Sequence, residues 1–276
     1  MSLVGIVGVG AMGRALLGRL KLAGQEVIAY DCHGPTLEQA RSMGAKIASS
    51  PAALAETATI IDVVVRTEDE VLHCTLGDEG VLRAAKRGTL LLLHSTILPR
   101  TTRKVAEAAK PKGIDVMDAC MVGVPRVVEK GEVTFLVGGP AELLNRARPH
   151  LLRMGKKVMH MGPLGAGNAA KLIKNLLTGA EPLLIHEAIK IGEASGIRYP
   201  DALEMMKALY SGSLLGHWEE RFDPSGKTSA PKPGTNIWDK DLPLAAELGR
   251  EYGVEIPITE QLAAAGLRLM AGKSHS

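Results

Sequence analysis

Apolar residues in the amino-terminal part of the chain come in short continuous runs, separated by stretches in which apolar residues recur at helical spacing. Continuous runs rich in Val, Ile and Leu are typical of strands buried on both faces, as in a parallel sheet with helical crossovers. The runs predict strands at Val4–Val7, Glu26–Tyr30, Ala45–Ala48, Ile60–Val65, Thr89–Leu93, Ile114–Met117, Glu132–Val137 and Lys156–Met161. Helical spacing over Ala11–Leu22 predicts a helix directly after the first strand.

The pattern changes at a break over Gly162–Gly165. Beyond it, Asn168–Ser195 predicts one long helix, and we expect no further strand. Pro182 removes a backbone donor and clashes with the preceding turn, so we expect a kink near Gly179. The segment Phe222–Asn236 is rich in Pro, Gly, Ser and Lys and predicts a loop.

A length of 276 residues exceeds the usual size of one domain, which favours two. The break in the pattern divides the chain into an α/β domain over residues 1–163 and a helical domain over residues 164–276. The predicted crossovers place the first domain in the α/β class.

Composition excludes several classes of function. Aromatic residues make up only 3% of the chain and the net charge is +3, so nothing favours a nucleic-acid partner. The apolar runs are much shorter than the roughly 20 residues that span a bilayer, and we expect neither a membrane segment nor a signal peptide. Cys32, Cys74 and Cys120 are widely spaced, without a CxxC pair or clustered His. We therefore expect no metal site, and we expect buried, reduced thiols in a cytoplasmic protein.

The first motif is a glycine turn between the first predicted strand and helix. It matches GxGxxG, in which the first glycine permits a tight turn, the second lets the backbone approach a pyrophosphate, and the third allows close helix packing. The residues expected to hold a dinucleotide are Gly8, Gly10, Ala11, Met12 and Gly13. Asp31 ends the second predicted strand, where a carboxylate accepts ribose hydroxyls and repels the extra phosphate of NADP. This favours NAD; the alternative for Asp31 is a solvated turn carboxylate.

The second motif opens the long helix at Gly165-Ala-Gly167-Asn-Ala-Ala-Lys171-Leu-Ile-Lys174-Asn175. Lys171 and Asn175 are four residues apart and so share one helix face, while the glycines permit close approach of a neighbour. A lysine in a partly desolvated cleft can exchange a proton with a hydroxyl or carbonyl oxygen. On these residues alone, the alternative is a pair of solvated helix lysines.

With these two motifs the chain resembles the beta-hydroxyacid dehydrogenase family, which includes 3-hydroxyisobutyrate dehydrogenases. The family pattern GxGxxxKxxxN is met in full over Gly165–Asn175. Ser95-Thr96 followed by Pro99 looks like the segment that borders nicotinamide and substrate, and Lys240-Asp241-Leu242 resembles the KDL motif near the site. The resemblance covers nearly the whole chain. It implies a Rossmann-like α/β domain followed by an all-α domain, joined by a long interdomain helix.

The resemblance also implies the chemistry. A hydride would pass between nicotinamide and a small beta-hydroxy acid or its semialdehyde, with Lys171 as general acid/base. Asn175 and Thr96 would contact substrate, and Thr96 and Lys240 would also contact the cofactor. Members are commonly dimers or tetramers through the helical domain, so we expect a homodimer or homotetramer.

The segment Asp118–Val124 departs from the family's usual DAPVSGG. Val122 replaces a serine that helps to hold a substrate carboxylate, and Val124 replaces a glycine, which leaves the substrate open. We expect Val122 and Gly123 to line the substrate site. Arg126 is a candidate carboxylate clamp, and the alternative is a solvated surface arginine.

Two further departures lie at predicted strand ends, where open parallel sheets bind ligands. Arg66 stands in place of the family's usual Leu and is a candidate cofactor contact. His94 stands where relatives often carry an acidic residue; we expect a structural, hydrogen-bonding histidine, the alternative being one that titrates near neutral pH. For Trp218 and Trp238 we expect core packing, the alternative being a pocket wall.

Two other functions stay open. Val122 and Val124 permit an imine or keto-acid reductase of the same superfamily, although imine reductases usually lack the lysine that Lys171 matches. A non-catalytic dinucleotide-binding scaffold is the other, and Lys171, Asn175 and Lys240 argue against it.

Overall fold

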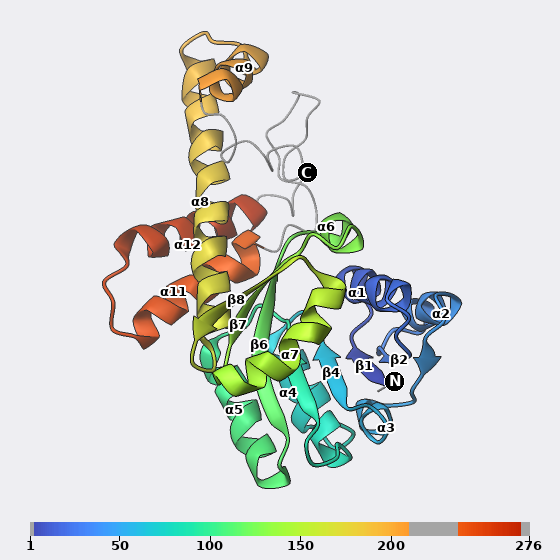
Figure 1. The fold of residues 1–276 in the computed structure, drawn as a ribbon. Coiled ribbons are helices and arrows are strands. Elements are labelled where there is room, and N and C mark those ends of the chain that lie inside the picture. Colours follow the sequence, from blue (N-terminus) through green and yellow to red (C-terminus); the bar gives the residue numbers. More distant parts are fainter. Residues whose placement is uncertain (1–2, 210–236, 272–276) are drawn as a thin grey trace. The chain divides into compact units, whose positions relative to one another are not determined.

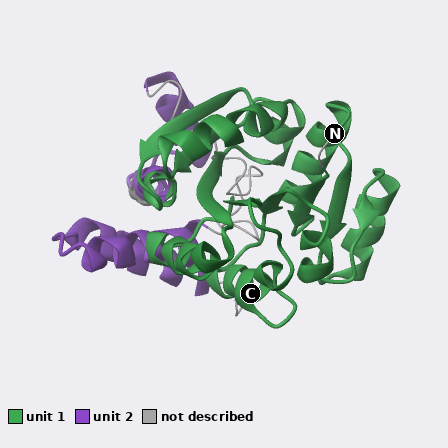
Figure 2. Ribbon diagram, turned by 60° about the horizontal axis from the view of Figure 1, so that its bottom comes forward, with its two compact units in different colours: residues 1–171 green, residues 172–276 purple. Residues whose placement is uncertain are grey.

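The computed structural model describes residues 3–209 and 237–271. The chain forms two compact units, Met1–Lys171 and Leu172–Ser276 (Figure 2). This division falls later than the expected boundary after residue 163, because the first turns of helix α8 (Ala166–Ala194) are hydrogen-bonded to the first unit. The predicted loop Phe222–Asn236 and Trp218 lie outside the described residues.

The first unit is built on an eight-stranded sheet with the order β3-β2-β1-β4-β5-β6-β7-β8 (Figure 1). A strand is present at each of the eight predicted positions. Their bounds are β1 Val4–Val7, β2 Val27–Tyr30, β3 Lys46–Ile47, β4 Ile60–Val63, β5 Leu90–Leu93, β6 Asp115–Val122, β7 Thr134–Gly138 and β8 Lys157–Gly162. The strand order reverses between β2-β1 and β4, and ligands bind beside the carboxyl ends of strands at such a reversal.

One strand pairing differs from the expected parallel sheet. β7 runs antiparallel to β6, with Asp118 opposite Gly138, whereas the other pairs are parallel. The chain between β6 and β7 holds only the short helix α6 (Pro125–Glu129). A connection of this kind returns at the same end of the sheet, which gives an antiparallel neighbour.

Helices cover both faces of the sheet. One face packs against α1 (Ala11–Leu22), α2 (Gly34–Ser42), α6 and α7 (Ala141–Met154), and the other against α3 (Pro51–Ala55), α4 (Glu68–Leu76) and α5 (Pro99–Ala109). Side chains of β5 alternate between the two cores, Leu90 and Leu92 on one side and Leu91 and Leu93 on the other. The strands β1, β4, β5, β6 and β7 are therefore buried on both faces, as their continuous apolar runs predict, whereas the edge strands β3 and β8 are largely exposed.

The second unit is helical, and no strand occurs among its described residues. It contains α8 from Leu172 onward, α9 (Tyr199–Leu209), the π-helical turn η3 (Ile237–Asp241), α11 (Leu242–Glu251) and α12 (Pro257–Ala271). Trp238 is fully buried in its core and donates a hydrogen bond from Nε1 to the Gly179 carbonyl at 3.0 Å. This confirms core packing for Trp238. The helix α8 continues as one element through Gly179 and Pro182, and the kink expected near Gly179 stays a prediction.

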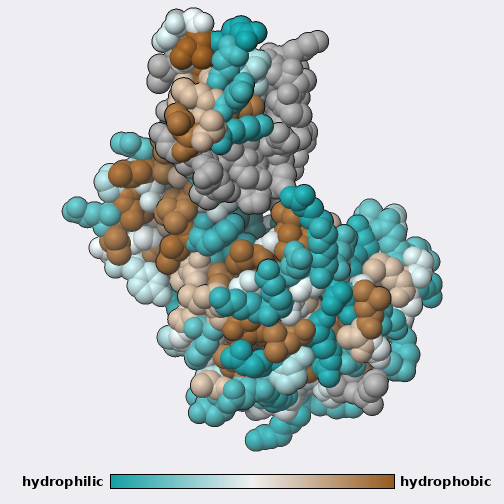
Figure 3. All heavy atoms as spheres, turned by 45° about the horizontal axis from the view of Figure 1, so that its top comes forward, coloured by the Kyte–Doolittle hydropathy of each residue, from teal (hydrophilic) through white to brown (hydrophobic). Residues whose placement is uncertain are grey.

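Apolar side chains also lie on the surface of the second unit (Figure 3). Ile173, Leu177 and Leu184 of α8 and Ile258 of α12 are each more than half exposed. Apolar surface of this kind is typical of protein interfaces; the homodimer or homotetramer stays a prediction. In the described ranges, no helix is both long and apolar enough to cross a membrane.

Candidate active site

The three glycines of the turn after β1 each have a distinct environment. Gly8 has φ +92°, and a Cβ atom there would lie 2.6 Å from the Val64 carbonyl oxygen. A Cβ on Gly13 would collide with the Gly8 carbonyl oxygen, whereas one on Gly10 would meet nothing within 4 Å. Helix α1 begins at Ala11 without a side-chain cap, and the N–H groups of such a helix start attract anions. The turn is thus tight at its ends and open at its centre, as a pyrophosphate site requires.

Asp31 connects the end of β2 to this turn. Its Oδ2 accepts a hydrogen bond from Val9 N at 2.8 Å, and its Oδ1 accepts one from His33 N at 2.9 Å. Asp31 is therefore more than a solvated turn carboxylate. Each carboxylate oxygen has a second lone pair, so the same group can also accept ribose hydroxyls.

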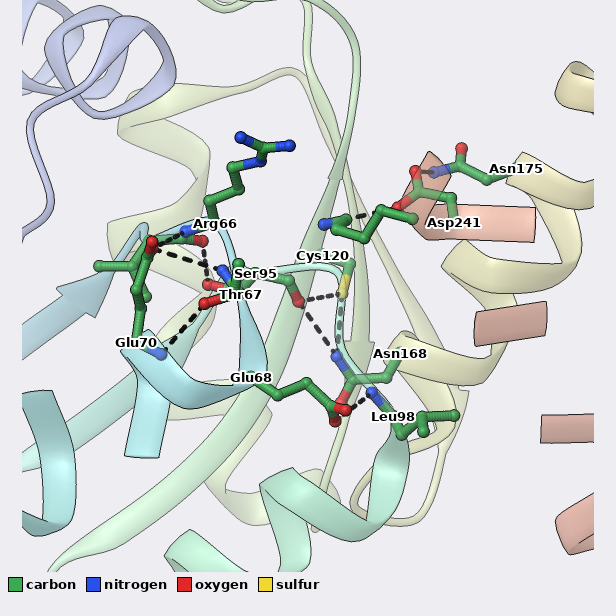
Figure 4. A network of polar contacts seen from close by, with 12 residues as sticks. Arg66, Thr67, Glu68, Glu70, Ser95, Leu98, Cys120, Asn168, Asn175 and Asp241 are labelled. Carbon is green, nitrogen blue, oxygen red and sulfur yellow. Dashed lines mark hydrogen bonds and ion pairs between the residues drawn. The ribbon is translucent and has the colours of Figure 1, made fainter. Parts of the chain in front are cut away.

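The carboxyl ends of β4 and β5 lie next to each other at this edge of the sheet. After β4, the Arg66 N–H donates to the Glu70 carboxylate at 2.7 Å, and Thr67 and Glu70 form a capping box that starts α4. The Arg66 side chain is exposed and extends away from Glu70 (Figure 4). After β5, the Ser95 hydroxyl donates to the Val65 carbonyl at 2.6 Å. Thr96 follows it and is half-buried.

Asp118 of β6 fixes the start of α8. Its carboxylate accepts hydrogen bonds from Gly165 N at 2.7 Å and from Asn168 N at 2.8 Å. Burial raises the pKa of Asp118 above its usual value, and these backbone hydrogen bonds act against that rise. A Cβ on Gly167 would collide with the Leu136 carbonyl, which confirms that this glycine permits close approach.

The Asn168 side chain joins the same helix turn to β5 and β6. Its Nδ2 lies 3.3 Å from both the Ser95 carbonyl and Cys120 Sγ (Figure 4), and its Oδ1 accepts from the Thr102 hydroxyl at 2.7 Å. Asn168 and Asp118 are positioning residues that the motif analysis did not single out. The only sequence signal was their place within the two family segments.

Lys171 lies one turn after Asn168, at the end of the first unit, and is half-buried. Asn175 follows one turn later on α8 and is buried in the second unit. Its Nδ2 donates to Asp241 Oδ2 at 2.7 Å, and Asp241 also pairs with Lys240 at 3.4 Å (Figure 4). The Lys240-Asp241 motif therefore orients the Asn175 amide, which keeps its oxygen for another partner.

The segment after β6 places the departures from the family pattern at the same edge of the sheet. Val122 ends β6 and is half-buried, and Gly123 adopts φ +150°, where a Cβ would lie 2.9 Å from Val127. Arg126, in the first turn of α6, is exposed. A contact between Arg126 and a carboxylate stays a prediction.

One cysteine expectation is wrong. Cys32 is exposed, because it lies between the end of β2 and the start of α2 rather than inside an element, whereas Cys74 and Cys120 are buried. All three are thiols. Among the described residues, no cluster of His, Cys, Asp or Glu is arranged to hold a metal ion.

His94 is buried and hydrogen-bonded at both ring nitrogens, which confirms its structural role. Nδ1 lies 2.6 Å from the Ala119 carbonyl, and Nε2 lies 2.8 Å from Asp62 Oδ1. His150 Nε2 lies 2.8 Å from Asp62 Oδ2. Sequence reasoning missed Asp62 and His150, which are 88 residues apart and share no motif.

Comparison with known proteins identifies the family. Residues 3–162 match the NAD binding domain of 6-phosphogluconate dehydrogenase, and residues 165–275 match the NAD-binding domain of NADP-dependent 3-hydroxyisobutyrate dehydrogenase. The chain belongs to the beta-hydroxyacid dehydrogenase family.

Individual proteins that are similar to this chain support the same family. The chain is 35% identical to 3-hydroxyisobutyrate dehydrogenase of Pseudomonas aeruginosa, over 94% of this chain and 89% of the relative. It is 31% identical to 2-(hydroxymethyl)glutarate dehydrogenase of Eubacterium barkeri, over 93% of this chain and 85% of the relative. A structure of Mycobacterium tuberculosis 3-hydroxyisobutyrate dehydrogenase with L-serine matches with a TM-score of 0.84 and 28% identity, covering 98% of this chain and 94% of that one.

These matches confirm the fold class and the enzyme class: the protein is an NAD(P)-dependent dehydrogenase of this family. An imine reductase from Myxococcus stipitatus also matches, with a TM-score of 0.65 and 20% identity over all of this chain and 95% of that one. At that identity the likeness shows a shared fold alone.

The glycine turn of this dehydrogenase gives a first prediction. Gly13→Ala is expected to lower the free energy of unfolding by about 1–3 kcal/mol, because the added methyl group overlaps the Gly8 carbonyl. Gly10→Ala has open space and should change that free energy by less than about 0.5 kcal/mol. It should nevertheless raise the Kd for NADH about tenfold, or about 1.4 kcal/mol, by holding the pyrophosphate away from the backbone. Urea denaturation and NADH fluorescence titration measure both; an unchanged Kd in Gly10→Ala would contradict the role of this turn.

Proposed function

We propose that this dehydrogenase uses NAD to oxidise a small beta-hydroxy acid to its semialdehyde, or to run the reverse reaction, with Lys171 as the general acid/base. The observation that carries the proposal is the placement of Lys171 one helix turn after Asn168. Asn168 holds that turn to the carboxyl ends of β5 and β6 through its side chain and backbone. The catalytic helix and the nucleotide-binding edge of the sheet are thereby parts of one unit.

In this mechanism, the glycine turn and α1 bind the pyrophosphate and Asp31 accepts the ribose hydroxyls. When bound, NAD supplies the hydride acceptor. In the oxidative direction, the neutral Nζ of Lys171 takes the proton of the substrate hydroxyl group. The carbon that bears this hydroxyl group gives up its hydrogen as hydride. In the reductive direction, the ammonium form of Lys171 returns that proton to the carbonyl oxygen. In the first unit, Thr96 is the expected substrate contact and Arg66 a further cofactor contact; in the second unit, Asn175 is the expected substrate contact and Lys240 the expected cofactor contact.

The names of the relatives suggest a substrate class. Three relatives are named after 3-hydroxyisobutyrate, 2-(hydroxymethyl)glutarate and L-serine. All three compounds carry a hydroxymethyl group on the carbon next to a carboxylate. We propose the same unit for the substrate of this chain. Its carboxylate would be bound by Arg126 and the Gly123 amide, because Val122 offers no hydroxyl, and Val122 would favour an apolar substituent.

A cofactor-coupled absorbance screen tests this function. The panel contains small 3-hydroxy acids, their semialdehydes, keto acids and cyclic imines, each with NAD(H) and NADP(H). Turnover confined to compounds with the hydroxymethyl-carboxylate unit and to their semialdehydes is the expected result. Turnover of imines or keto acids alone would replace the proposal with the reductase alternative. No turnover by a protein that binds NADH would favour a dinucleotide-binding scaffold.

Asp31 carries the proposed preference for NAD. Asp31→Asn and Asp31→Ser are both expected to lower the ratio of kcat/KM for NAD over NADP at least tenfold, about 1.4 kcal/mol, because each removes the charge that repels the extra phosphate. Asn and Ser both keep an acceptor for the Val9 N–H. Initial rates with both cofactors measure the ratio, and denaturation confirms that the variants are folded. A ratio unchanged in both variants would remove Asp31 from this role.

A further inference from the structure

Three polar side chains of the first unit meet between the sheet and helix α7, and none of the three is assigned a part in the proposed reaction. Asp62 lies on β4, His94 directly follows β5, and His150 lies on α7. The side chains are 0%, 0% and 1% exposed. Both histidine Nε2 atoms lie 2.8 Å from the Asp62 carboxylate, one on each oxygen. We call these three residues the Asp62 triad.

The hydrogen-bond partners fix the protons of His94. The Ala119 carbonyl only accepts hydrogen bonds, so Nδ1, at 2.6 Å, must carry a hydrogen. The opposite orientation of the ring would turn carbon atoms toward both of its partners. The contact between Nε2 and Asp62 holds a further proton, which sits either on the ring beside a carboxylate or on Asp62 beside a neutral ring.

The surroundings of this contact favour that proton on His94. Asp62 faces ring nitrogens on both of its oxygens, an arrangement that stabilises the carboxylate. Although burial acts to raise the pKa of Asp62, its interactions with His150 and His94 hold that pKa well below its usual range. The His94 ring also lies 5.6 Å from the Phe135 ring, within the reach of a cation–π contact.

His150 completes the charge balance. Its Nδ1 is buried and has no hydrogen-bond partner among the described residues. A buried N–H without an acceptor costs about 1–3 kcal/mol, so this nitrogen is the unprotonated one of a neutral ring. His150 then donates from Nε2 to Asp62. With a carboxylate, an imidazolium and a neutral imidazole, the Asp62 triad has no net charge, as its burial favours.

We propose that the Asp62 triad holds His94 as a doubly protonated donor that locks the end of β5 between β4 and β6, and that His94 is thereby a positioning residue for Ser95, Thr96 and the first turn of α8. This inference rests on the proposed function only where it concerns turnover.

Contacts beyond His94 give the path by which it acts. The residue after His94 is Ser95, whose carbonyl accepts hydrogen bonds from Asn168 Nδ2 at 3.3 Å and from Cys120 Sγ at 3.5 Å. Cys120 directly follows Ala119, the acceptor of His94 Nδ1. Loss of the His94 side-chain bonds would remove one link from the β5 end to β4 and one to β6, and would leave the bonds from His94 N to Val63 and from Ser95 Oγ to Val65. The Asn168 turn, which precedes Lys171, depends on the same Ser95 carbonyl.

Nitrogen-15 NMR of the histidine rings at neutral pH tests the triad without any substrate. In the wild type, both His94 nitrogens should resonate in the protonated range, and His150 should show one protonated and one bare nitrogen. In Asp62→Asn, the amide can donate to His94 Nε2 and accept from His150, so His94 Nε2 should move to the bare range while Nδ1 stays protonated. A bare His94 nitrogen in the wild type would overturn the assignment.

His94→Asn tests the positioning role, because it keeps a donor that can reach Ala119 and loses the one to Asp62. We expect kcat to fall at least tenfold, with KM for NAD changed less than about threefold. The backbone amide resonances of Ser95, Thr96 and Asn168 should shift. Asp62→Asn retains every hydrogen bond and should keep kcat within about threefold. His160→Asn is the matched control, since His160 Nε2 bonds the Gly139 carbonyl at 2.8 Å outside the triad.

The outcomes separate the two claims. If the wild type oxidises no hydroxy acid, the proposed function fails, and the ring and amide resonances still decide the triad and its positioning role. An unchanged kcat and unshifted Ser95 and Asn168 amides in folded His94→Asn would overturn positioning. A large loss of kcat in folded Asp62→Asn would also overturn it, because the hydrogen bonds would then not be what acts.

Discussion

Replacement of Lys171 by alanine is expected to lower kcat by about 10³–10⁴-fold, near the upper end of the range for loss of a general acid/base. The loss should appear in kcat, because the proposed role of Lys171 is proton transfer during the hydride step. Lys171 belongs to α8, whereas the glycine turn and Asp31 belong to separate elements of the first unit. The Kd for NADH should therefore change less than about threefold. Initial-rate kinetics and NADH titration measure the two effects.

Two companion variants separate proton transfer from charge. Lys171→Arg keeps a positive charge, but arginine does not lose its proton in proteins, so this variant should be as inactive as Lys171→Ala. Lys174→Ala is the matched control, since it removes a lysine from the same helix three residues later and should change kcat less than about threefold. Small primary amines added to Lys171→Ala should restore part of the rate. Substantial activity in Lys171→Arg would contradict the acid/base role.

The parts of this enzyme that sequence predicts well are those fixed by local patterns. The central strands β1, β4 and β5 are short apolar runs, and such a run identifies a buried strand without knowledge of its neighbours. The glycine turn is similar, because the steric need for Gly8 and Gly13 arises within one strand, one turn and one helix. The direction of β7 was not predictable in this way, since periodicity carries no information about direction.

Residues that act through distant partners could not be identified. Asp118 directly follows the predicted strand Ile114–Met117 and begins a family segment, yet nothing in that pattern shows that it holds the start of α8 through backbone atoms 47 and 50 residues away. Asp62 lies 32 residues from one triad partner and 88 from the other. A buried carboxylate inside a run of Ile and Val is itself a signal, because its desolvation requires a partner. The sequence does not say which histidine that partner is.

Replacement of Asp62 by alanine is expected to lower the free energy of unfolding by about 3–5 kcal/mol, the range for removing one member of a buried ion pair. Two buried histidine donors would lose their acceptor, and the charge on His94 would have no counterion. Asp62→Asn is the matched variant, because its amide has the same shape and can bond both rings. It should cost at least about 1 kcal/mol less than alanine. Urea denaturation at neutral pH measures both changes.

The acid side of the stability profile shows whether Asp62 is charged. Its pKa in the folded protein lies below that of an unfolded aspartate, which is about 3.9. The stability that Asp62 contributes is therefore fully present above about pH 4 and is lost as the pH falls below that value toward the folded pKa. For Asp118 the pH dependence is reversed. Its pKa is raised in the folded protein, so the stability that it contributes is present at low pH and is lost as the pH rises.

Comparison of two variants isolates the Asp62 contribution, since all other carboxylates are common to both chains. The difference in unfolding free energy between the wild type and Asp62→Asn should shrink as the pH falls below about 4, where the aspartate of the unfolded wild type takes up a proton. Asp118→Asn is the contrasting control. Because the pKa of Asp118 is raised, the difference in unfolding free energy between the wild type and Asp118→Asn should grow, not shrink, as the pH falls. A wild-type minus Asp62→Asn difference that stays constant to pH 3 would mean that Asp62 gains no ionisation advantage on folding, and the imidazolium assigned to His94 would then lose its counterion.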